Sequence, residues 1–173
     1  MGKHVFVTVG TTKFDALIEA IDDAALLSIL SSKGFTSLTA QIGHGGHIPT
    51  FPLGPQAAMD CKWYRFKPTL HEDMASADVV VSHAGAGSVM EALGLGKALV
   101  VVVNDALMDN HQEELAEALA RRDHLRATTP RGLAATLIGL DDAPSARTPY
   151  PQPKPGAFAA LVDEEMCAAQ KGR

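Results

Sequence analysis

The stretch DVVVSHAGAGS, residues 78–88, decides the fold of this chain. Its β-branched start is typical of a buried strand over 78–82. The small residues that follow predict a turn into a helix over 85–95, which Gly96 ends. Backbone amides at a helix start carry partial positive charge, so this turn can bind a phosphate without any basic side chain.

Strands and helices are expected to alternate along the rest of the chain. Further strands are predicted over 4–9, 37–42, 61–66, 98–103 and 125–127. Further helices are predicted over 14–21, from about 26 to a stop near Gly34, from Pro68 to Ala75, over 110–121, and after a capping Thr129 with Pro130 in the first turn. This order predicts an α/β fold, a Rossmann-like parallel sheet with helices on both faces.

The domain organisation follows from length and composition. The chain has 173 residues and a mass of 18.2 kDa, enough for one α/β domain and too little for two. We expect the domain to cover 1–142 and a loop rich in glycine and proline to lie over 43–55. A proline-rich connector is expected over 143–156. An amphipathic helix is expected over 157–173, with an apolar stripe formed by Phe158, Leu161, Val162 and Met166.

Charge and cysteine content exclude several classes of function. The formal net charge is −5 and no basic block is present, which argues against binding to a nucleic-acid backbone. Cys61 and Cys167 lie far apart, so neither a disulfide framework nor a zinc site is indicated, and a reducing compartment fits. No apolar run approaches the length that crosses a bilayer, so we expect a soluble chain.

Three segments at the expected carboxyl edge of the sheet are candidates for ligand binding. The first is the turn 82–88, followed one helical turn later by Glu91, whose carboxylate can accept hydrogen bonds from ribose hydroxyls. The second is the turn 10–12 and the third is 110–112, which can hydrogen-bond a sugar. The alternative is that the glycines only allow tight packing, and that Asp109 or Asn110 caps a helix while His111 is merely exposed.

Motifs for binding a metal or a cofactor are weak or absent. His44 and His47 share a glycine loop, but no carboxylate or thiol accompanies them, so we expect no metal. The sequence lacks both GxGxxG and GxxxxGK[ST], which disfavours a nicotinamide-dependent oxidoreductase and a Walker loop. We therefore expect no cofactor.

Several motifs, in order, carry a resemblance to a known family. They are FVTVGTTKFD (6–15), QIG (41–43), DVVVSHAGAGS (78–88) and NHQ (110–112). Over residues 4–128 the chain resembles the catalytic, donor-binding subunit of eukaryotic UDP-N-acetylglucosamine transferase. That subunit is similar to the C-terminal half of the bacterial GT-B glycosyltransferase that makes lipid II, a family 28 enzyme. The resemblance implies an α/β domain equivalent to that half.

The resemblance also implies a reaction and its partners. The family transfers N-acetylglucosamine (GlcNAc) from UDP-GlcNAc to dolichyl-diphosphate-GlcNAc, the second step of N-glycan precursor assembly. The acceptor binds to a membrane-anchored partner subunit, so this chain is expected to be cytoplasmic, recruited to the cytosolic face of the endoplasmic reticulum membrane, and inactive alone. A non-catalytic nucleotide-sugar-binding regulatory module would use the same glycine turns and remains the alternative.

The resemblance also implies a role for each candidate residue of the donor site. The resemblance places the donor diphosphate at Ala86, Gly87 and Ser88, the ribose at Glu91 and uracil at Phe66 and Lys67. It places the sugar at Asn110, His111 and Gln112. The remaining donor-binding candidates belong to the two glycine turns and are Gly10, Thr11, Thr12, His83 and Gly85. By residue type, His83 or His111 could be the general base, although we expect the base on the partner. Small departures from the family pattern are His44, Ala98 and Asp109.

Overall fold

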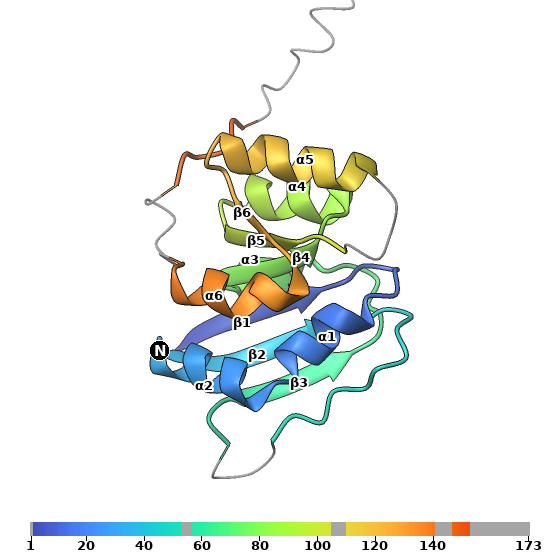
Figure 1. Cartoon of the computed structure of the whole chain (residues 1–173), viewed down its shortest axis with the longest axis vertical. Coiled ribbons are helices and arrows are strands. Elements are labelled where there is room, and N and C mark those ends of the chain that lie inside the picture. Colours follow the sequence, from blue (N-terminus) through green and yellow to red (C-terminus); the bar gives the residue numbers. More distant parts are fainter. Residues whose placement is uncertain (1, 53–56, 105–109, 141–146, 153–173) are drawn as a thin grey trace, which may run out of the picture.

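A parallel sheet runs through the centre of the molecule (Figure 1). The computed structural model describes residues 2–52, 57–104, 110–140 and 147–152. Its strands, in the order β3-β2-β1-β4-β5-β6, are β1 (Lys3–Thr8), β2 (Phe35–Gln41), β3 (Asp60–Tyr64), β4 (Val79–His83), β5 (Ala98–Val102) and β6 (Arg126–Thr128). The order reverses between β1 and β4, and ligands of open α/β sheets bind in the crevice at the carboxyl ends of such strands.

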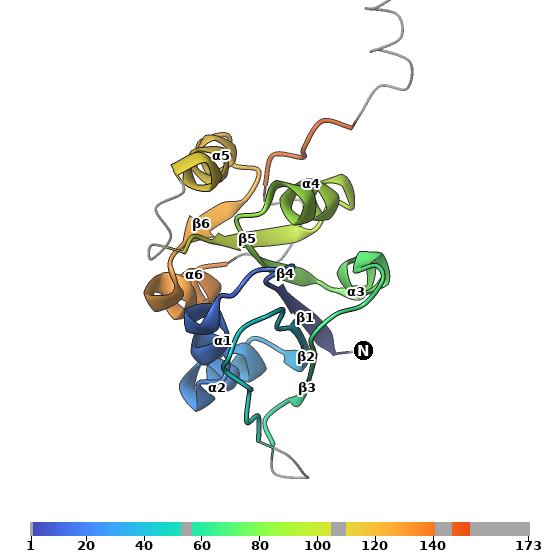
Figure 2. The same cartoon turned by 90° about the vertical axis from the view of Figure 1, so that its right-hand side faces the viewer.

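Helices cover both faces of the sheet, as expected (Figure 2). One face carries α1 (Asp15–Ile21), α2 (Ala24–Ser32), a 3₁₀ turn (Pro130–Gly132) and α6 (Leu133–Ile138). The other carries α3 (His71–Ser76), α4 (Ala86–Gly94) and α5 (Asn110–Arg121). Alternate strand residues face opposite sides, so Val5 and Val7 join the first core while Phe6 joins the second.

One predicted helix start is wrong, and one predicted cap lacks its hydrogen bond. α3 begins at His71, three residues after Pro68, and the Thr69 hydroxyl accepts a hydrogen bond from the His71 amide at 3.2 Å. Thr129 stands at the expected capping position in extended backbone, but its side chain makes no capping hydrogen bond. Pro130 does open the turn, which is a 3₁₀ helix that leads into α6.

The described part of the proline-rich segment, residues 147–152, lies on the α4 side of the sheet. The Thr148 carbonyl is 2.8 Å from His124 Nδ1, and the Tyr150 ring meets the His124 ring edge-on at 5.3 Å. Gln152 donates to the carbonyl of Gly94 at the end of α4. The boundaries at 142 and 156 remain predictions, and the expected helix over 157–173 lies outside the described residues.

Candidate functional site

The start of α4 presents free backbone amides at the crevice. Gly85 occupies the position before the helix, and no described side chain caps it. The first backbone bond of the helix runs from the Val89 amide to the Gly85 carbonyl, so the amides of Ala86, Gly87 and Ser88 have no partner within the helix. The positive end of the helix is therefore available to bind an anion.

The glycines of this turn serve two different purposes. A Cβ at Gly85 would lie 2.2 Å from His83 Nε2, and one at Gly10 would lie 2.7 Å from His83 Cε1. Gly10 also has a φ of +62°, which favours glycine. At Gly87, in contrast, a Cβ would meet nothing within 4 Å. Close packing against His83 therefore explains why residues 10 and 85 are glycines. It does not explain why residue 87 is a glycine.

His83 ends β4 with its ring between the two glycine turns. Burial lowers the pKa of His83, while a contact with the Thr8 backbone raises it and only partly compensates. Nδ1 is buried and has no hydrogen-bond partner among the described residues. The ring is therefore neutral near pH 7, as a general base must be, but glycine backbone closes around it.

The first part of the predicted loop, residues 43–52, is tied to the domain by side chains. Arg65 donates to the carbonyls of Gly43 and Gly45 at 2.9 and 3.0 Å. Asp15 accepts from the His47 amide, and Asp22 accepts from the Thr50 amide and contacts the His47 ring at 3.0 Å. These carboxylates and Arg65 hold the loop by hydrogen bonds to its backbone. The sequence did not predict these contacts, because the bonded groups are distant in the chain.

The residues predicted to meet uracil lie at the carboxyl end of β3. Phe66 is 46% exposed, and its ring lies 4.6 Å from that of His44. The Lys67 ammonium is held by both oxygens of Asp73 at 2.8 Å and lies over the Tyr64 ring. Burial would raise the pKa of Asp73, but the hydrogen bonds from Lys67 and Tyr64 lower it. Phe66 thus offers an open aromatic face, whereas Lys67 is already engaged.

Glu91 projects from α4 one turn beyond Gly87 and Ser88, as predicted. Its Oε1 lies 3.1 Å from Nδ1 of His71 at the start of α3, and the Glu91 side chain is 37% exposed. His71 has no motif signal, because only the packing of α3 beside α4 brings it to Glu91. Its imidazole contacts the carboxylate that the sequence predicts to bind the ribose.

The third predicted segment lies at the start of α5. Asn110, His111 and Gln112 form the first turn of that helix, as the sequence predicts. Their side chains, and Asp109, lie outside what the structure describes. The sugar-binding role of these residues therefore stays a prediction.

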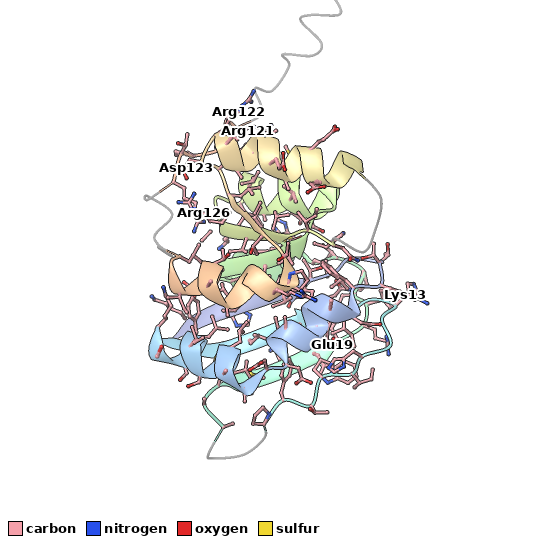
Figure 3. All side chains as sticks on the ribbon, in the orientation of Figure 1. Lys13, Glu19, Arg121, Arg122, Asp123 and Arg126 are labelled. Carbon is pink, nitrogen blue, oxygen red and sulfur yellow. The ribbon has the colours of Figure 1, made fainter. Side chains whose placement is uncertain are left out.

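Charges are distributed unevenly around the sheet. Figure 3 shows Arg121, Arg122 and Arg126 at the edge opposite the crevice, while Lys13 extends from the loop after β1.

Among the described side chains, no group of three His, Cys, Asp or Glu residues could hold a metal ion, and His44 and His47 have separate partners. No described helix is both long and apolar enough to cross a membrane.

The fold and the crevice define a class of protein. The sheet matches the Rossmann-like C-terminal half of GT-B glycosyltransferases. MurG of Acinetobacter baumannii superposes with a TM-score of 0.67 over 94% of this chain and 49% of MurG, at 20% identity, a likeness of fold alone. The NMR structure of ALG13 superposes with a TM-score of 0.66 at 26% identity and covers 92% of this chain and 94% of ALG13.

The family follows from sequence comparison. Residues 4–163 match the model described as the glycosyltransferase family 28 C-terminal domain, and the chain belongs to that family. The UDP-N-acetylglucosamine transferase subunit ALG13 of Yarrowia lipolytica is 35% identical over 164 residues, which cover 92% of this chain and 82% of that protein. The Mus musculus subunit of the same name is 46% identical over 132 residues, 76% of this chain. The chain spans only 11% of the length of the mouse relative.

Proposed function

We propose that this chain binds UDP-GlcNAc and forms the donor half of an inverting GlcNAc transferase. The acceptor is dolichyl-diphosphate-GlcNAc, held by a membrane-anchored partner subunit at the cytosolic face of the endoplasmic reticulum. The observation that carries the proposal is the uncapped start of α4 at the sheet crossover, with open space beside Gly87. The name of the Yarrowia relative, of which the chain covers most, supports the choice of donor.

The proposed mechanism divides the work between the two subunits. The 4-hydroxyl oxygen of the acceptor sugar attacks the anomeric carbon of the donor, and the bond from that carbon to the UDP oxygen breaks. The amides of Ala86, Gly87 and Ser88 stabilise the charge that develops on the departing diphosphate. Glu91 holds the ribose, Phe66 contacts uracil, and the acceptor proton passes to a base that we place on the partner.

Binding and transfer are tested separately. Calorimetry of the isolated chain with UDP tests the donor site, and NAD in the same assay should give no heat, because no dinucleotide fingerprint is present. Adding the membrane partner and lipid acceptor should then produce the disaccharide product. Binding without turnover in the reconstituted pair would instead identify a nucleotide-sugar-binding regulatory module.

We expect turnover of the reconstituted pair to be independent of divalent metal. Amides at the helix start, and not a cation, neutralise the phosphates in this proposal. Activity in excess chelator should match activity in magnesium. A loss in chelator that magnesium or manganese restores would contradict the proposed phosphate site.

The C-terminal segment is proposed to dock on the partner. A helix as short as 157–173 is marginal alone and needs a surface for its apolar stripe. Deleting residues 157–173 should abolish partner association while UDP affinity and the thermal midpoint change little. Retained association with full affinity, or unfolding of the shortened chain, would contradict docking of this segment on the partner.

A further inference from the structure

Gln41 lies at the carboxyl end of β2, between two strands whose loops are proposed to bind the donor. The strand register places it beside Thr8 of β1 and Tyr64 of β3. The residue is 2% exposed, so it cannot touch a ligand as the crevice stands. Its position nevertheless allows it to reach the backbone of both neighbouring loops.

The carboxamide of Gln41 is fully used in hydrogen bonds. Nε2 donates to the Gly10 carbonyl at 2.7 Å and to the Arg65 carbonyl at 2.6 Å, while Oε1 accepts from the Thr8 hydroxyl at 2.6 Å. Two carbonyls can be served only by the NH₂ end of the amide, so this chemistry fixes its orientation. The Thr8 hydroxyl in turn accepts from the Gly10 amide at 3.1 Å.

These bonds cross-link the loop after β1 to the loop after β3. Arg65 immediately precedes Phe66, the proposed contact for uracil. Gly10 packs against the His83 ring, which also packs against Gly85 before α4. A shift of Gly10 would therefore press on His83 and on the turn proposed to hold the diphosphate, because the ring lies close to both glycines.

We propose that Gln41 is a positioning residue that sets the spacing between the uracil-binding and diphosphate-binding parts of the donor site. The inference rests on the proposed function. A ligand that spans two loops binds best when those loops are already fixed at the right separation. Loosening the cross-link should thus weaken UDP, which touches both parts, more than uracil, which touches only the part at Phe66.

The decisive variant is Gln41→Met, which keeps the volume and removes all three hydrogen bonds. We expect the UDP dissociation constant of the full chain to rise about tenfold or more while that of uracil changes less than about twofold. The control is Thr39→Val, a buried polar change two residues earlier on the same strand, which should alter neither constant. Calorimetry for UDP and competition NMR for uracil provide the measurements.

A second pair of variants applies if Gln41→Met does not fold. Thr8→Ser keeps the hydroxyl that links Gln41 to the Gly10 amide, and Thr8→Val removes it, so the serine variant should retain UDP affinity that the valine variant loses. The inference is overturned if UDP and uracil weaken together, if Gln41→Met binds UDP as the wild type does, or if both Thr8 variants behave alike. A wild-type chain that does not bind UDP would instead refute the proposed function.

Discussion

The two sides of the crevice are built in opposite ways. On the side of β1, β2 and β3, buried or half-buried side chains satisfy the loop backbone, as Arg65 does for Gly43 and Gly45. On the side of β4, the start of α4 has no side-chain cap and Gly87 faces open space. A loop whose polar groups are paired is rigid before a ligand arrives, whereas an uncapped helix end is left for the ligand to complete. The difference fits the proposal of a preformed uracil side and an anion-binding side.

The glycine pair of the β4 turn offers the sharpest test of this difference. Gly85→Ala places a methyl group against the His83 ring, so we expect a loss of about 1–3 kcal/mol in the free energy of unfolding. Gly87→Ala meets no neighbour and should leave stability unchanged or slightly higher, while weakening UDP binding by about 1–3 kcal/mol because the methyl group blocks approach to the amides.

Chemical denaturation and UDP calorimetry on both variants provide the measurements. If Gly87→Ala binds UDP normally, the open space beside that residue is not the phosphate site. If Gly85→Ala is as stable as the wild type, the His83 ring is less confined than the structure indicates.

Glu91 provides the next largest expected effect, on binding alone. Glu91→Ala should weaken UDP binding by about 1–2 kcal/mol through loss of a charge-assisted hydrogen bond, a value reduced because the side chain is 37% exposed. Glu117→Ala on α5, where the carboxylate pairs with Arg121, is the control and should leave binding unchanged. Unchanged affinity in a folded Glu91→Ala variant would assign Glu91 to the helix surface.

The smallest expected effect is on the pH dependence of stability. Burial lowers the pKa of His83 in the folded state, so below the ordinary value of 6.5 the unfolded chain binds a proton that the folded chain does not. Stability should be complete above that value and fall as the pH drops below it. His83→Gln should flatten this decline relative to the wild type.

A second histidine contributes to the same slope. Burial, together with Lys62, lowers the pKa of His4, so His4→Gln should remove a separate part of the decline. Denaturation midpoints measured across this range separate the two contributions. A His83→Gln variant with the full wild-type slope would show that His83 is protonated as easily in the folded state as in the unfolded state.

The strands were predictable because each is a short apolar run bounded by turn residues. All six lie within two residues of the predicted ranges, and α5 begins and ends where expected. The helix expected from Pro68 begins only at His71, and Thr129 precedes the predicted turn without making the expected capping hydrogen bond. A proline fits the first turn of a helix but does not by itself start one, and a threonine can occupy the capping position without a hydrogen bond from its side chain to the helix.

The class of fold and the two glycine turns follow from the amino-acid sequence, because strand hydrophobicity, helix periodicity and turn chemistry are local properties. That Gly85 serves packing while Gly87 stays open depends on where the His83 ring lies, which follows from tertiary packing. The contacts of His71 and Gln41 depend on tertiary packing in the same way. A polar side chain acquires its role from its partners, and these partners come together only when strands and helices distant in sequence pack side by side.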